Sequence, residues 1–235
     1  MSDIDIFVIS VVQFFAVNLG SRLVEAYKLG SLAHGGFSDI YSDIDVGLVL
    51  NCHEPPLGMS ELIAGAKALH PEYGKKLSMF WTNPEFDWGR LPVIDRLDLL
   101  DHGVPLLHGI KPSLRRPSKD EIHQEQLQSI ERSWKPRLPE LSRLTSLEAK
   151  DRKPYIRAIL YAARLIYTWD NLVVGSNDAA VDYLHSVRPI GLDLKVIDMA
   201  LACRKGDCSA EEVMGLGIDL NRQCESATSY ILGRP

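Results

Sequence analysis

The chain has 235 residues, a formal net charge of -5, and hydrophobic residues at 46% of its positions. This length suffices for one large domain or two modest ones with buried cores, and the composition is that of an ordinary globular protein. A mildly acidic surface argues against a nucleic-acid partner and suits a cationic one.

The cysteines and the N-terminus indicate the compartment. The four cysteines, at positions 52, 203, 208 and 224, form no Cys-x-x-Cys pair, so we expect free thiols in a reducing compartment. The apolar run over residues 6–15 follows an acidic start, whereas a secretory signal begins with positive charge. The run is shorter than a bilayer requires. We therefore expect a buried helix ending near Gly20, no membrane contact and a cytoplasmic location.

The first 112 residues mix strand and helix patterns. In chain order, the sequence predicts a helix to about residue 18, strands over 22–30 and 42–50, a helix over 60–70 with Ser60 as N-cap, a strand over 75–82, a helix over 91–103 ended by Gly103 and a short strand over 104–109.

The character of the chain changes at residues 109–121, which hold two prolines and four basic residues and which we interpret as a linker. Beyond them the pattern is helical. Ser118 with Glu121 and Ser209 with Glu212 have the spacing of capping boxes, and apolar residues recur with helical period at positions 156, 159, 160, 163 and 166. The sequence therefore predicts an α/β (α+β) domain with a small mixed sheet over residues 1–112, and an all-α bundle of about five helices over residues 118–235.

Two aspartates, Asp43 and Asp45, stand one residue apart within the apolar run of the second strand. Because side chains alternate along a strand, both should point to the same side. Burying an unpaired carboxylate is expensive, and a divalent cation removes that cost. Carboxylate oxygens favour Mg²⁺, which takes phosphate oxygens as further ligands. The pair therefore indicates chemistry on a nucleotide.

A glycine-rich loop precedes these acids. Gly30 and Ser31 follow the first strand, and two further glycines come at positions 35 and 36. Glycine lets the backbone approach a phosphate closely, while amides and serine hydroxyls donate hydrogen bonds to its oxygens. Ser31 and Ser42 would flank such a site. The alternative interpretation is a surface turn in which Asp39, Ser42 and Asp43 act only as caps.

The chain resembles the nucleotidyltransferase superfamily of the polymerase β type in one motif. The motif consists of Gly30-Ser31, an intervening stretch of 11 residues, and Asp43-Ile44-Asp45 on a strand. The resemblance implies that Gly30, Ser31 and Ser42 bind the triphosphate and that Asp43 and Asp45 hold two Mg²⁺ ions. The stretches 156–184 and 196–206 are similar to the helical domain of aminoglycoside adenylyltransferases of the streptomycin/spectinomycin type. The implied activity is transfer of AMP from ATP to a hydroxyl of a small acceptor, such as an aminoglycoside antibiotic.

The chain departs from the family pattern in two places. The family carries a third carboxylate on the next strand, but Ser78 stands there in this chain. Glu72, Glu85 and Asp87 are candidates to complete the site. Asn177 replaces the family's usual lysine.

These departures leave two alternatives to a small-molecule transferase. One is a degenerate family member that binds nucleotide as a regulatory or interaction module. The other is a toxin-type enzyme that modifies tRNA or protein, although the acidic balance argues against tRNA. Lys153, Arg157 and Arg164 are candidates to supply the positive charge of the missing lysine.

Overall fold

The computed structural model describes residues 2–107 and 115–234. The chain forms two compact units. Residues 1–37 and 42–117 make an α/β unit, while residues 118–235 make a helical unit together with the short segment Ser38–Tyr41. An α/β unit with a small mixed sheet and a following helical unit confirm the predicted fold class.

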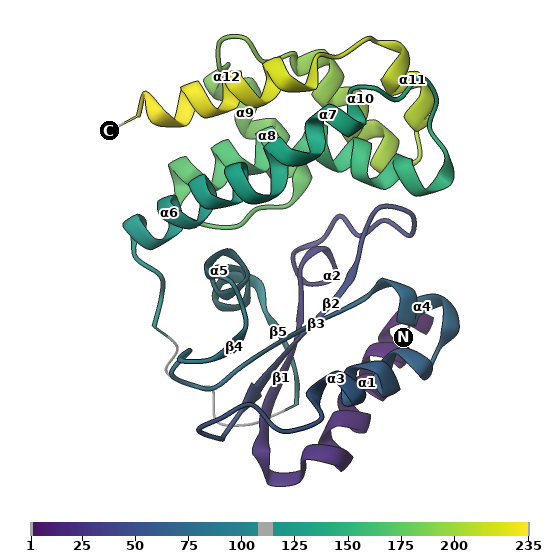
Figure 1. Cartoon of the computed structure of the whole chain (residues 1–235), viewed down its shortest axis with the longest axis vertical. Helices are drawn as coiled ribbons and strands as arrows, with labels where there is room; N and C mark the ends of the chain where they lie inside the picture. Colours follow the sequence, from purple (N-terminus) through teal and green to yellow (C-terminus); the bar gives the residue numbers. More distant parts are fainter. Residues whose placement is uncertain (1, 108–114, 235) are drawn as a thin grey trace. The chain divides into compact units, whose positions relative to one another are not determined.

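The α/β unit contains a five-stranded sheet in the order β4-β3-β2-β1-β5 (Figure 1). Its strands are β1 (Leu23–Leu29), β2 (Ile44–Leu50), β3 (Leu77–Thr82), β4 (Gly89–Arg90) and β5 (Val104–Leu107). β1 runs antiparallel to β2 and to β5, β2 runs parallel to β3, and β3 runs antiparallel to β4. The register places Asp45 between Leu29 on one side and Ser78 on the other.

Helices cover both faces of this sheet (Figure 1). One face packs against α1 (Asp3–Leu19), α3 (Met59–Ala68) and α4 (Pro71–Lys76). The other face packs against α5 (Val93–His102), where Leu99 contacts a cluster of strand residues that includes Tyr27, Leu29 and Val49. The sheet is therefore buried on both faces, and its side chains alternate between two separate apolar clusters.

Helix α1 ends at Leu19, close to the predicted end of the first helix. With the 3₁₀ turn η1 (Gly20–Arg22) it is long and apolar enough to cross a membrane by length and composition, so the expectation that this run is too short is wrong. Its N-terminus is fixed by a capping box between Ser2 and Asp5. One side of the helix is buried in the core of the α/β unit, as in a core helix, through Phe7, Val8, Val11, Val12, Phe15 and Leu19.

Two local predictions in this unit differ from the structure. Helix α3 begins at Met59 with Gly58 as its N-cap, not Ser60, because Gly58 adopts the positive φ of 78° that the turn needs. Helix α4 was not predicted; Pro71 stands at its first turn and the His70 side chain accepts the Tyr73 amide. Residues 109–114 of the predicted linker lie outside the described residues.

The helical unit is organised around α8 (Ala149–Asn171). Its predicted apolar stripe is buried, and both predicted capping boxes are confirmed. The remaining α-helices of this unit within the described ranges are α6 (Lys119–Ser129), α7 (Leu138–Leu141), α9 (Asn177–Val187), α10 (Leu194–Lys205), α11 (Ala210–Gly215) and α12 (Leu220–Leu232).

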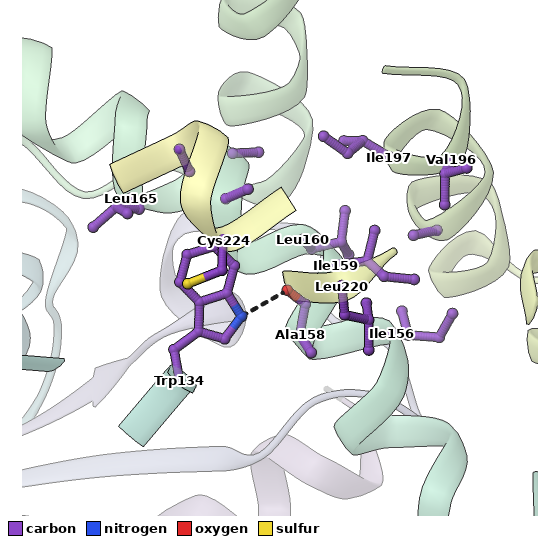
Figure 2. Packing of buried hydrophobic residues seen from close by; sticks show 14 of the residues in the cluster. Trp134, Ile156, Ala158, Ile159, Leu160, Leu165, Val196, Ile197, Leu220 and Cys224 are labelled. Atoms are coloured by element: carbon purple, nitrogen blue, oxygen red, sulfur yellow. Dashed lines mark hydrogen bonds between the residues drawn. The ribbon is translucent and has the colours of Figure 1, made fainter. Parts of the chain in front are cut away.

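Trp134 anchors the chain between α6 and α7 to the central helix (Figure 2). It ends the π-helical turn η2 (Ile130–Trp134), which the 3₁₀ turn η3 (Lys135–Arg137) follows. Its indole Nε1 donates a hydrogen bond of 3.1 Å to the Ala158 carbonyl, so the buried N–H is satisfied. Cys224 of α12 belongs to the same cluster, and all four cysteines are free, as predicted.

Candidate active site

The turn after β1 requires glycine at position 30 for two reasons. Gly30 has φ 61° and ψ -149°, a conformation that strains any residue with a side chain. A Cβ at this position would overlap Asp45 Oδ2 and lie 3.2 Å from Asp45 Cγ. The Asp45 carboxylate therefore rests directly against the Gly30 backbone, so the glycine loop and the strand acid meet as the spacing implied.

The serines of the predicted site also meet. Ser31 is the first residue of the short helix α2 (Ser31–His34), and its hydroxyl donates to Ser42 Oγ across 2.9 Å. Ser42 is buried, whereas Asp43 and Asp45 are partly exposed. Because β2 begins at Ile44, Asp43 precedes the strand and only Asp45 lies within it. The structure thus gathers Gly30, Ser31, Ser42 and Asp45, with Asp43 beside them in the chain.

Asp98, a residue that the sequence analysis missed, forms a hydrogen bond with this turn. The Gly30 amide donates a hydrogen bond of 2.7 Å to Asp98 Oδ2 on helix α5. Asp98 is only 7% exposed. This amide is therefore already bonded to a carboxylate of the protein. The sequence did hold a sign of Asp98, because an acid stands between Leu97 and Leu99 at buried helix positions.

Helix α5 also contacts the other end of α2. One helical turn after Asp98, the His102 ring meets the His34 ring edge-on, with centroids 5.6 Å apart. The loop that approaches Asp45 is thus held by α5 at Gly30 and again at His34.

None of the proposed replacements for the third carboxylate stands beside Asp45. Ser78 pairs with Asp45 in the sheet, so it occupies the position expected for the missing acid. Glu85 and Asp87 follow the C-terminal end of β3, whereas Asp45 lies near the N-terminal end of the parallel strand β2. A six-residue strand spans roughly 20 Å, so these two candidates are wrong. Glu72 belongs to α4, on the other face, and its side chain is 78% exposed beside Lys75.

The chemistry of the donor set fits a magnesium ion that is completed by substrate. Within residues 2–107 and 115–234, no three His, Cys, Asp or Glu side chains come together as a metal site. Mg²⁺ keeps several waters and is held in nucleotide enzymes by one or two carboxylates plus phosphate oxygens. Asp43 and Asp45 supply that number of carboxylates, and no softer ligand is needed.

The helical unit brings three arginines together where α10 packs on α8. Arg157 and Arg164 of α8 lie near Arg204 of α10, and the pKa of Arg204 is lowered by burial first and then by these two neighbours. Arg204 Nη1 also donates to the Tyr41 carbonyl across 3.3 Å. The sequence analysis named two of these three arginines as replacements for the missing lysine and overlooked Arg204, because only the packing of α10 on α8 brings it to them.

Tyr41 explains why Ser38–Tyr41 belongs to the helical unit. Its side chain is buried in the helical core, and its hydroxyl lies 3.0 Å from Cys203 Sγ. Tyr41 therefore packs as part of the helical core.

The comparisons with known proteins support the fold. No protein-family model and no curated protein matches the chain. A crystal structure of spectinomycin adenyltransferase AAD(9) from Enterococcus faecialis, with ATP and spectinomycin, is similar at a TM-score of 0.64 and 16% identity. The similarity covers 94% of this chain and 98% of that one. The resemblance seen in the sequence is thus confirmed as a resemblance of fold: the chain folds like this adenyltransferase over nearly its whole length.

Proposed function

We propose that the protein is a magnesium-dependent nucleotidyltransferase that transfers AMP from ATP to a hydroxyl of a small acceptor in the cytoplasm. The observation that carries this proposal is the packing of the Gly30-Ser31 turn against Asp45, with Ser42 hydrogen-bonded to Ser31. The fold supports it, because a protein of similar fold was crystallised with ATP and spectinomycin. An aminoglycoside-like antibiotic is accordingly the first acceptor class to test, and the net charge of -5 suits a cationic acceptor.

Each residue of the site has a role in this reaction. Asp43 and Asp45 would hold Mg²⁺, which when bound polarises phosphate oxygens and makes a coordinated hydroxyl more acidic. The Ser31 and Ser42 hydroxyls would donate hydrogen bonds to the polyphosphate. Gly30 leaves room for that approach because no side chain stands between the turn and the carboxylate.

The rate should be modest. With Ser78 beside Asp45, the strand supplies no carboxylate to take the proton of the acceptor hydroxyl. Loss of a general base typically lowers a rate by about a hundred- to ten-thousand-fold. Alignment of the reactants and electrostatic stabilisation by the remaining groups still contribute. The same Ser78 favours a second candidate function, a module that binds nucleotide without transferring it.

One experiment separates the two functions. The full chain is incubated with radiolabelled ATP, Mg²⁺ and a panel of aminoglycosides that includes spectinomycin and streptomycin. Pyrophosphate release together with an acceptor that is heavier by AMP supports the transferase, provided that both disappear in Asp45→Asn. Magnesium-dependent binding of a non-hydrolysable ATP analogue without turnover on any acceptor supports the binding module. Absence of nucleotide binding contradicts both.

A further inference from the structure

Asp98 is a buried acid that packing alone does not explain. Its Oδ2 accepts the Gly30 amide, but its Oδ1 is buried and has no hydrogen-bond partner among the residues that the structure describes. A buried acceptor without a donor lowers stability, and a buried carboxylate lowers it further. An apolar residue between Leu97 and Leu99 would avoid both losses but would leave the Gly30 amide without this acceptor. The reason for the acid is therefore to be sought at Gly30.

The geometry supplies one in Gly30, which lies between two carboxylates. Its amide is bonded to Asp98, and its Cα faces Asp45 Oδ2. Glycine is the residue with the most backbone freedom, so its φ of 61° must be set by the contacts around it. A hydrogen bond to a charged acceptor is shorter and stronger than a neutral one, which suits Asp98 for fixing this turn.

The helix that carries Asp98 is suited to transmit that constraint. α5 packs by Leu99 on the same sheet face to which Asp45 points, and it contacts α2 again through His102 and His34. Displacing the turn would remove the wall against which the Asp45 carboxylate rests. Small misplacements of groups that hold reactants can lower a rate by about a hundredfold.

We propose that Asp98 is a positioning residue of the active site: through the Gly30 amide it fixes the turn that orients the Asp45 carboxylate toward the metal-bound polyphosphate. This role rests on the proposed nucleotidyltransferase function. Asp98 itself need not touch substrate, and in the described residues it does not join Asp43 and Asp45 as a third metal ligand.

The kinetic test compares three variants of the full chain. In Asp98→Ala we expect kcat for pyrophosphate release to fall about 10- to 100-fold and the Mg²⁺ concentration at half-maximal rate to rise, with an unchanged KM for the acceptor. Asp98→Asn keeps a carbonyl acceptor for Gly30 and should recover part of the loss. Asp101→Asn, on the same helix and paired with Arg116, should match wild type. Wild-type kcat and Mg²⁺ dependence in Asp98→Ala would overturn the proposal.

A second measurement does not need turnover. The Gly30 amide should exchange its hydrogen slowly in wild type, and at least about tenfold faster in Asp98→Ala, while the Gly35 amide changes little. Unchanged exchange at Gly30 overturns the positioning role even if the enzyme is active. If wild type neither binds the ATP analogue nor releases pyrophosphate, the proposed function fails, and the exchange rate still decides whether Asp98 holds the turn.

Discussion

The two faces of the central sheet are built from different kinds of side chain. Under α1 and α3, strands β1, β2 and β3 bury an apolar set: Leu23, Ala26, Ile44, Val46, Leu48, Leu50, Leu77 and Met79. Under α5, the same strands bury Glu25 and Thr82 near Tyr27, Leu29 and Val49, and they direct Asp45 to that side. The helix over this face adds Asp98.

The difference assigns separate tasks to the two faces. Apolar burial contributes about 25 cal/mol per Å², so the face under α1 should supply most of the stability of the unit. Buried polar groups contribute little or reduce stability unless they are fully paired. Glu25 and Thr82 are paired with Tyr27 and with the Trp88 carbonyl, whereas Asp98 Oδ1 has no partner in the described residues, so Asp98 is the polar residue under α5 that stability explains least. Substitutions on the two faces should separate activity from stability.

The largest effect is expected for Asp45→Asn. Removing the charge that would hold Mg²⁺ should lower kcat/KM by at least about a thousandfold, or about 4 kcal/mol. Melting temperature should stay equal or rise, because a carboxylate in a strand is replaced by a neutral group. Pyrophosphate release measures kcat/KM, and thermal unfolding measures the melting temperature. A large fall in stability without a fall in kcat/KM would contradict the assignment.

Leu48→Ala should lower stability and leave kcat nearly unchanged, the reverse of what is expected for Asp45→Asn. Leu48 is 1% exposed on the apolar face, so the cavity should lower the free energy of unfolding by about 2–5 kcal/mol. Urea unfolding measures this, and kcat per folded molecule should remain near wild type. If Leu48→Ala instead abolished kcat in samples that are still folded, the two faces would not be separable.

Gly30→Ala should affect activity more than its backbone strain predicts. The chain offers a matched control in Gly20, whose φ of 57° and ψ of -134° are close to those of Gly30 but whose Cβ would meet nothing within 4 Å. Both variants carry the strain of a side chain in a backbone conformation that favours glycine, about 1–3 kcal/mol. Only Gly30→Ala also displaces the Asp45 carboxylate, so we expect an additional loss of about 30-fold in kcat. Equal kcat in both variants would contradict the contact with Asp45.

Much of the site could be predicted because it is local in sequence. The site residues lie within 16 positions of one another: Gly30, Ser31, Ser42 and Asp45. The alternation of side chains along a strand and the preference of a tight turn for glycine are enough to predict that they meet. The helical stripe on α8 and the capping boxes were predictable for the same reason, since each depends on residues three or four positions apart.

The rest depends on strand direction and helix packing. Glu85 and Asp87 looked suitable because they closely follow a strand next to the site, but β3 runs parallel to β2 and carries them to the opposite edge. Asp98 is 68 positions from Gly30, and Arg204 is 163 positions from Tyr41. No periodicity in the sequence specifies such pairs, because they arise only when α5 packs on the sheet and α10 packs on α8.

The smallest effect is expected at the N-terminus of α1, where an acid serves stability alone. The Ser2 hydroxyl, then the Ser2 amide, and more weakly Lys28 lower the pKa of Asp5 from 3.8. Because the folded-state pKa lies below the unfolded value, the stabilisation is complete above that value and is lost as pH falls through the lowered pKa. The carboxylate is 38% exposed, so water screens it and Asp5→Asn should cost only about 0.5 kcal/mol at neutral pH.

The melting temperatures of wild type and Asp5→Asn should therefore differ at neutral pH and converge below pH 3.8. Asp3→Asn, in the same helical turn, is the control, and kcat should be unchanged in both variants. A difference that persists in acid would show that Asn at position 5 disturbs the helix itself. A fall in kcat would extend the chemical role of acids to the face under α1, and the contrast between the two faces would then fail.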